Sequence, residues 1–399
     1  MTLRDDIRAG FDRKQATLGE VGDARHRLML DALAAREHVS HRAQWAAGIA
    51  AVLIAALVIT TFAVIRGVGR PHATPAVSPT PAVSPTTTAQ NLSVSDSTPI
   101  LVIRDPAASE QADAITWDGK AVGKLPFPAD GFSPNPAANL FASGGTIVDR
   151  SGAHVASGGF GAKFFSGTWA DDEVHFCLMT PFDVPGVGGV PTTLKLFDAR
   201  AGTARDVLQI GTVNSLTFMS VAACSVEFDR AVVVQSAGQG IGTAQYWVVE
   251  LSTGKILWTH NFQETSGPPV QIVSSRDGQT VAESQGQSST LFGLDGAVIG
   301  HVAGSVRIFC WDGSLALVDA GTGGGPARIV RVSDGGTVWS GPSGSGFYVY
   351  SYAAQPDGAS LAVGLHNPAN TDVKGLTAVD LYIVAPDGHV VTEMKDIYW

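Results

Sequence analysis

The chain contains only three cysteines, Cys177, Cys224 and Cys310, in 399 residues. So small a number excludes a scaffold built on a dense disulfide framework. The His-Glu-x-x-His and Gly-x-Ser-x-Gly patterns of hydrolases are missing, as is a phosphate-binding loop followed by a helix. We therefore name no catalytic residue, expect no cofactor and no metal site, and favour a non-enzymatic function.

Positive charge is scarce after residue 99. From residue 100 onward, 16 Lys and Arg residues stand against 28 Asp and Glu residues, and the whole chain has a formal net charge of −10. An acidic surface repels the phosphate backbone of DNA and RNA, so we expect no nucleic-acid partner. The same part is rich in glycine and poor in Lys, Glu and Met, which favours strands and turns over helices.

Residues 45–65, WAAGIAAVLIAALVITTFAVI, carry no charged side chain. About 20 apolar residues in a helix span the roughly 30 Å hydrocarbon core of a bilayer. A cleaved secretion signal is the main alternative, but such signals have a short leader and a small-x-small cleavage site. Here 44 residues precede the run, and Arg66-Gly-Val-Gly-Arg70 follows it. We predict that Trp45 to Ile65 is a permanent single-pass membrane anchor.

The segments that flank the anchor differ in charge and composition. Residues 1–44 carry eight Lys and Arg residues and form a predicted helical head, which the positive-inside rule places in the cytoplasm. Residues 66–99 contain PAVSPT twice and many Ser and Thr residues, and are predicted to be an extended linker. Residues 100–399 then form an extracytoplasmic domain. The head is either a solvated juxtamembrane helix or a docking element for a cytoplasmic partner.

Asp-Gly turns occur throughout this domain. The dipeptide starts at Asp118, Asp130, Asp277, Asp295, Asp312, Asp334, Asp357 and Asp387, and it does not occur before residue 100. It is typical of β-hairpins with type I′ turns, in which both central residues need a positive φ. A second feature is the regular spacing of turns between two apolar strands, near residues 118, 150, 200, 253, 295, 334 and 387.

These turns recur about every 45 residues, and four short strands per unit of that length are typical of a β-propeller. We therefore predict an all-β fold in which residues 100–399 form a single β-propeller of about seven four-stranded blades, with six or eight as alternatives. Pairing of Ile100–Ile103 with Lys395–Trp399 would close the ring and remove an exposed sheet edge. An array of β-sandwiches is the alternative fold.

Three segments carry a resemblance to known repeat families. VVELSTGKILWTH and RIVRVSDGGTVWSG resemble the outer hairpins of quinoprotein-like repeats, with Trp258 and Trp339 at the docking position, and Gln355–Ala362 is similar to WD-like and TolB-like propellers. The resemblance implies a propeller fold and names no substrate. Quinoprotein dehydrogenases also have adjacent cysteines and a calcium site, whereas this chain offers only Asp171-Asp172-Glu173, either a surface turn or a weak calcium site.

The order of short head, anchor and outer domain resembles that of single-pass bacterial anti-sigma factors. Many of those proteins carry a His/Cys zinc motif, but no cysteine accompanies His38 and His41 in this head. The resemblance is therefore one of architecture, and it implies a regulator whose head captures a cytoplasmic factor.

The repeat positions also predict the surroundings of the cysteines and tryptophans. Cys177 and Cys224 fall in neighbouring predicted blades, so either a disulfide joins them or each is a buried thiol. Cys310 lies in apolar surroundings and is expected to be a buried thiol. Five tryptophans of the domain are expected to pack between strands, with a ligand platform in the central funnel as the alternative. These five are Trp169, Trp247, Trp258, Trp311 and Trp339.

The predicted function is a membrane-anchored binding or scaffold module for a protein, a glycan or an envelope component. The alternatives are an extracytoplasmic enzyme, such as a quinoprotein-like dehydrogenase or a lactonase-like hydrolase, and the anti-sigma type of regulator. The chemistry of the funnel distinguishes these classes. Converging carboxylates or histidines would indicate an enzyme or a metal site, and a neutral lining would indicate a binding module.

Overall fold

The computed structural model describes residues 92–399, except 105–110, 129–131, 144, 158–166, 182–188, 215–216, 238–241, 265–269, 321–324, 357, 371 and 373–375. The chain divides into two compact units, Met1–Pro85 and Thr86–Trp399, and the described residues all belong to the second. The predicted head, the predicted anchor at 45–65 and most of the linker lie outside them. Among the described residues, no helix is both long enough and apolar enough to span a bilayer.

The described residues form antiparallel strands that follow one another in the sheets in chain order. The first group has three strands, β1 (Ile100–Arg104), β2 (Ala112–Thr116) and β3 (Ala121–Leu125). The next two groups are β4 (Ser133–Pro134), β5 (Leu140–Ser143), β6 (Thr146–Asp149) and β7 (His154–Ser157), then β8 (Gly167–Trp169), β9 (His175–Thr180), β10 (Val190–Asp198) and β11 (Thr203–Val213).

Four further groups complete the domain. Two of them are β12 (Thr217–Ser225), β13 (Arg230–Ala237), β14 (Gly242–Glu250) and β15 (Ile256–Glu264), then β16 (Gln271–Ser274), β17 (Thr280–Gln285), β18 (Ser288–Gly293) and β19 (Val298–Ala303). The last two are β20 (Ser305–Phe309), β21 (Leu315–Asp319), β22 (Arg328–Arg331) and β23 (Thr337–Ser340), then β24 (Tyr348–Ala354), β25 (Leu361–His366), β26 (Ala378–Val384) and β27 (Val390–Tyr398).

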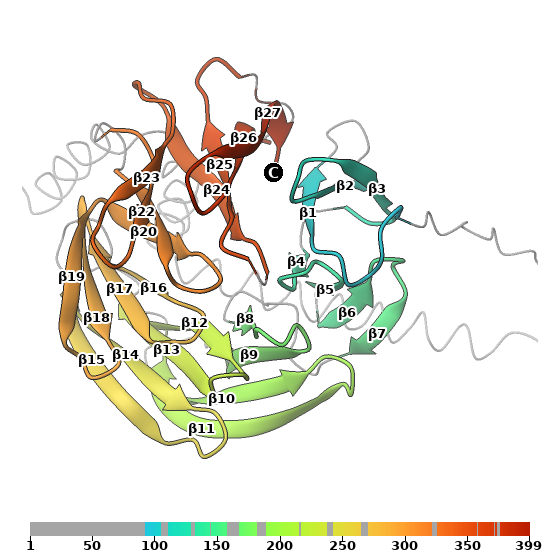
Figure 1. Ribbon diagram of the computed structural model, residues 1–399. Helices are drawn as coiled ribbons and strands as arrows, with labels where there is room; N and C mark the ends of the chain where they lie inside the picture. Colours follow the sequence, from blue (N-terminus) through green and yellow to red (C-terminus); the bar gives the residue numbers. More distant parts are fainter. Residues whose placement is uncertain are drawn as a thin grey trace, which may run out of the picture. The chain divides into compact units, whose positions relative to one another are not determined.

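Six of the groups have four antiparallel strands, as the repeat spacing predicts, and β1–β3 is a group of three strands. Figure 1 shows the groups side by side around a common centre, with β4, β8 and β24 toward the middle and β7, β11, β15 and β19 at the periphery. Within the last group, all seven residues of the third strand, β26, are buried, whereas the fourth strand, β27, is largely exposed. This arrangement is that of a β-propeller.

The first and last groups join in one sheet. Strand β1 pairs with β27 through Arg104 and Tyr398, so the sheet order runs from β24 to β27 and on through β1 to β3. The Thr392 hydroxyl of β27 also donates a hydrogen bond to the Asp118 carbonyl at 2.9 Å. The predicted pairing of Ile100–Ile103 with Lys395–Trp399 is thus reduced to a single residue pair, one position beyond Ile103.

Where the structure describes both residues, the Asp-Gly turns form hairpins, but the predicted type I′ geometry is wrong. In the β16–β17 turn, Gly278 N–H donates to the Ser275 carbonyl at 2.9 Å, and Gly278 alone has a positive φ, of 66°. This is a type I turn followed by a glycine bulge. The reason is the aspartate side chain, because Asp277 Oδ1 accepts the Gln279 N–H at 2.9 Å and holds the tighter turn.

A second set of turn glycines brings neighbouring sheets together. These glycines lie in the turn before the outermost strand of a sheet and contact the outermost strand of the preceding sheet or the residue that follows it. A Cβ built on any of six of them would meet that neighbour; the pairs are Gly119 with Thr392, Gly152 with Pro126, Gly202 with Ala156, Gly254 with Val207, Gly296 with Trp258 and Gly388 with Val338. The contact of Gly119 with Thr392 continues the series across the junction of the first and last groups.

A disulfide also joins two neighbouring sheets. Cys177 on β9 and Cys224 on β12 are bonded, with their Cα atoms 5.8 Å apart, and they stand 47 positions apart in the sequence. The expectation that Cys224 could be a buried thiol is therefore corrected. By constraining the unfolded chain, a cross-link over a loop of this length contributes about 2–4 kcal/mol to the free energy of unfolding.

The glycine contacts predict a large difference between two alanine substitutions. Gly335 has a φ of 70° and open space around its Cα, so Gly335→Ala should lower the free energy of unfolding by only about 1 kcal/mol, from backbone strain. Gly388 has a φ of 91°, and its Cβ would overlap the Val338 carbonyl oxygen, so Gly388→Ala should cost about 3 kcal/mol. Urea unfolding of the full chain in detergent measures both. Equal losses would contradict tight docking of the turn.

Candidate functional site

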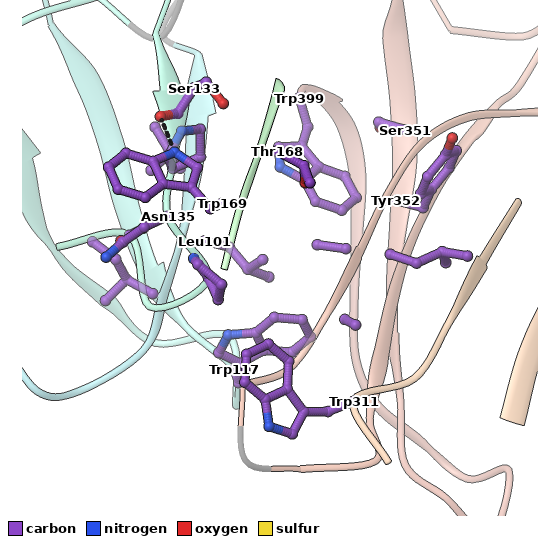
Figure 2. A pocket seen from close by; sticks show the side chains of 18 of the residues that line it. Leu101, Trp117, Ser133, Asn135, Thr168, Trp169, Trp311, Ser351, Tyr352 and Trp399 are labelled. Carbon is purple, nitrogen blue, oxygen red and sulfur yellow. Dashed lines mark hydrogen bonds between the residues drawn. The ribbon is translucent and has the colours of Figure 1, made fainter. Parts of the chain in front are cut away.

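A cavity of about 690 Å³ lies among the innermost strands of the propeller (Figure 2). This volume falls within the roughly 300–1,000 Å³ typical of small-molecule pockets. The aromatic residues that line the cavity are Trp117, Trp169, Trp311, Tyr352 and Trp399. The other lining residues are aliphatic or neutral polar; they are Ile100, Leu101, Val102, Ser133, Pro134, Asn135, Pro136, Ala138, Gly167, Thr168, Ile308, Ser351, Ala353 and Ala354.

The five aromatic rings come from distant parts of the chain. Trp117 follows β2, Trp169 ends β8, Trp311 lies in the β20–β21 turn, Tyr352 belongs to β24 and Trp399 follows β27. Figure 2 shows Trp117 and Trp311 at the lower end of the cavity and Trp399 above them. Tyr352 is 41% exposed, and Trp311 and Trp399 are partly exposed, so these three rings offer accessible faces.

Two tryptophans that were expected to pack between strands also line the cavity. Trp169 packs edge-on against Phe176, with ring centroids 5.3 Å apart, as expected of a packing residue, but it also lines the cavity. Trp311 likewise belongs to the lining, whereas Trp247 and Trp339 are buried in hydrophobic clusters. The sequence analysis missed Trp117 and Trp399, because one lies in a turn and the other follows the last strand.

Hydrogen bonds fix part of the wall and leave two polar atoms unpaired. Trp169 Nε1 donates to the Ser133 carbonyl at 3.0 Å, and Asn135 Nδ2 donates to the Glu173 carbonyl at 2.8 Å. Among the described residues, Trp117 Nε1 and Ser351 Oγ are buried without a hydrogen-bond partner. An unpaired buried polar group costs about 1–3 kcal/mol, so both atoms favour a ligand group or a water that reaches them.

The lining is electrically neutral. Among the described residues that form it, no side chain carries a carboxylate, an imidazole, an amine, a guanidinium or a thiol. The polar side-chain groups are the hydroxyls of Ser133, Thr168, Ser351 and Tyr352, the Asn135 amide and the indole N–H groups. This composition suits the binding of an uncharged molecule through ring faces and hydrogen bonds.

One cation lies directly behind the lining. The guanidinium carbon of Arg276, in the β16–β17 turn, is 3.8 Å from the centroid of the Trp311 ring. Arg276 Nη2 also lies 3.1 Å from Asp171 Oδ2 and 2.7 Å from Glu227 Oε2. Arg276 is not part of the lining, so it supports the indole from outside and fixes the position of its cavity face.

Asp171 anchors this arrangement. Its side chain is fully buried and accepts hydrogen bonds from the Ser225 hydroxyl and from the Val226 N–H at 2.8 Å. Asp171, Ser225, Arg276 and Trp311 lie in or next to the turns after the first strands of four consecutive sheets. A chain of charge-assisted contacts therefore links these sheets on the face where Trp311 is held.

The predicted surface turn or calcium site at Asp171-Asp172-Glu173 is different in the structure. Asp171 is buried, Asp172 accepts the His175 N–H at 2.9 Å, and Glu173 has a φ of 62°. The three carboxylates thus have separate partners. In the part of the chain that the structure describes, no cluster of three or more His, Cys, Asp or Glu side chains could hold a metal ion.

Cys310 and the His260–Glu283 pair are titratable groups outside the cavity lining. Cys310 is a buried free thiol, as expected, and burial, together with a hydrogen bond to Asp312, raises its pKa. His260 Nε2 lies 3.2 Å from Glu283 Oε2, between the sheets that contain β15 and β17. Burial raises the pKa of Glu283, and His260 partly opposes that shift. Both groups are part of the packing between strands.

Comparisons with known proteins support no family assignment. No protein-family model matches the chain, and no curated protein sequence matches it. Similar solved structures include a functionally unknown protein from Desulfotomaculum acetoxidans, 11% identical over 75% of this chain and 96% of that chain, with a TM-score of 0.47. Others are Kluyveromyces lactis Hsv2 (12% identity, 74% and 93% covered, 0.41) and the dihydro-heme d1 dehydrogenase NirN in complex with DHE (12%, 77% and 66%, 0.43). At these scores the fold assignment rests on the strand topology.

The support of Trp311 predicts unequal effects of two arginine substitutions. Arg276→Met leaves the fully buried Asp171 carboxylate without a counter-charge and should lower the free energy of unfolding by about 2–3 kcal/mol. Arg331→Met removes an ion pair with Asp334 in which both side chains are at least half exposed, and should cost less than about 0.5 kcal/mol. Chemical unfolding measures both values. A loss for Arg276→Met as small as that for Arg331→Met would contradict an anchoring role.

Proposed function

We propose that the protein is a single-pass membrane protein whose extracytoplasmic domain, a seven-bladed β-propeller, is a binding module. In this proposal β1–β3 form the seventh blade, and the aromatic cavity holds the ligand. The observation that carries the proposal is the neutral, aromatic lining of a cavity placed at the meeting point of several sheets. Propellers commonly bind ligands where elements from several blades converge.

The neutral lining favours binding over catalysis. General acid–base or nucleophilic catalysis uses side chains such as carboxylates, imidazoles, amines or thiols placed at the substrate. The described lining residues supply instead ring faces, hydroxyls and one amide. The cavity therefore gives no specific support to the dehydrogenase and hydrolase alternatives, and the regulator alternative concerns residues 1–44, which are not described.

Two observations support the location outside the cytoplasm. The uncharged run from Trp45 to Ile65 has the length of a membrane helix, and most basic residues near it lie on its N-terminal side. The Cys177–Cys224 disulfide joins two sheets of the propeller, and disulfides persist in oxidising compartments such as the bacterial periplasm or the cell surface. Both support the proposed position of the propeller on the outer side of the membrane.

This location predicts how many thiols react in cells. Intact cells that produce the full chain are denatured in a maleimide reagent without reduction, and the adducts are counted by mass. An exported propeller should carry one adduct, on Cys310, and a cytoplasmic one should carry three. Reduction before labelling is the control and should give three adducts in either case. Three adducts without reduction would contradict export.

The proposed binding role predicts that ligand affinity depends on Tyr352 and not on Tyr350. Both tyrosines lie on β24 and have similar exposure, 41% and 44%, but only Tyr352 lines the cavity. Fractionated envelope material should change the tryptophan fluorescence of the detergent-solubilised full chain. Tyr352→Ala should weaken this response about tenfold through loss of a ring contact, and Tyr350→Ala less than twofold. Equal responses of the two variants would place binding outside the cavity.

A further inference from the structure

The accessible surfaces of the cavity have two kinds of chemistry. Trp311, Tyr352 and Trp399 expose ring faces, which carry partial negative charge and attract polarised C–H groups. Between them lie neutral hydrogen-bonding groups, including the Thr168 and Tyr352 hydroxyls. A ligand that satisfies both must offer flat C–H surfaces and hydroxyl groups within a few ångströms of each other.

Charged ligands fit this lining poorly. A buried carboxylate or phosphate needs a cationic or multiply hydrogen-bonding partner, and the described lining residues include no Lys, Arg or His side chain. The guanidinium of Arg276 lies against Trp311, outside the lining, and already contacts Asp171 and Glu227. The excess of acidic residues in the domain further opposes an anion.

Purely apolar ligands also fit poorly. Filling the cavity with hydrocarbon would strip water from the Thr168 and Tyr352 hydroxyls without giving them new hydrogen-bond partners. Each unpaired group would oppose binding. A ligand that carries several hydroxyls supplies partners to the same groups while its C–H faces cover the rings.

These constraints together describe a sugar ring. We propose that the cavity binds an uncharged oligosaccharide, with pyranose C–H faces stacked on Trp311, Tyr352 and Trp399 and with ring hydroxyls bonded to the neutral polar groups. This inference deepens the proposed binding function and rests on it. The cation–π contact of Arg276 holds Trp311 from outside, so that its inner face is already oriented when the sugar arrives.

The test uses the full chain in a polyoxyethylene detergent, because maltoside detergents carry neutral sugars that would compete. Four probes are titrated by calorimetry and by tryptophan fluorescence: cellotriose, N,N′,N″-triacetylchitotriose, trigalacturonic acid and tetramethylammonium chloride. The first two are neutral sugars, the third is an anionic sugar and the fourth is a cation that aromatic cages attract. At least one neutral trisaccharide should bind at least about tenfold more tightly than the acidic one.

Variants assign the binding to the cavity. Tyr352→Ala should raise the Kd of the neutral trisaccharide about tenfold, Tyr352→Phe about threefold because the ring remains, and the matched control Tyr350→Ala less than twofold. Both sites lie on one strand with similar exposure, so general destabilisation would affect the two alanine variants alike. Thermal unfolding of each variant checks that the fold is retained.

The outcomes separate this inference from the function on which it rests. Tyr352-dependent binding of a neutral trisaccharide supports both. Tyr352-dependent binding of trigalacturonic acid or tetramethylammonium, with no response to the neutral sugars, overturns the carbohydrate inference and leaves the binding function standing. Binding that Tyr352→Ala does not weaken overturns the placement in the cavity. No response to any of the four probes overturns the carbohydrate inference, and the envelope titration then decides the binding function.

Discussion

The close approach of turn glycines to neighbouring outer strands is the contact on which the propeller depends. At Gly254 and Gly388 the approach is to a backbone carbonyl, that of Val207 and that of Val338, so a side chain at either glycine would push two sheets apart. Because the sheets approach so closely, the strands between the innermost and outermost positions lose contact with water. This explains why β21, the second strand of its group, and β26, the third strand of its group, are buried at every residue.

The cavity follows from an irregularity in this ring. The β2–β3 turn corresponds to the last turn of the other groups, so β1 corresponds to a second strand and its group has no described innermost strand. The neighbouring inner strands are also short, with two residues in β4 and three in β8, whereas β12 has nine. Space is therefore left beside β1, β4 and β8, and large indole rings line it.

Much of the fold could be predicted from the sequence, because turn chemistry is local. The Asp-Gly pairs and their spacing identify the four-stranded repeats, and apolar runs identify the strands between them. The turn type was mispredicted, since the deciding bond from Asp277 to the Gln279 N–H depends on side-chain geometry. The Cys177–Cys224 bond could not be decided from the sequence for the same reason. The sequence places the two residues in neighbouring sheets but does not give the distance between them.

The site was far less predictable than the fold. Trp117 and Trp399 carry no local pattern that distinguishes a cavity residue from a packing residue, and they meet only because the ring brings its first and last sheets together. Asp171 has the sequence context of a solvated acidic turn, and its burial depends on partners 54 and 105 positions away, Ser225 and Arg276. Such long-range neighbours are set by the number of strands per sheet and the order of the sheets, which no short segment encodes.

The position of the cavity has a consequence for the seam of the ring. Leu101 and Trp399 line it from the two segments whose pairing joins the first and last sheets, and that pairing consists of one residue pair, Arg104 with Tyr398. A molecule held between these segments contacts both of them and so links them non-covalently. Since whatever binds the native state alone stabilises it by mass action, ligand concentration and closure of the seam are thermodynamically linked. The junction of the first and last groups is therefore most stable when the protein is occupied.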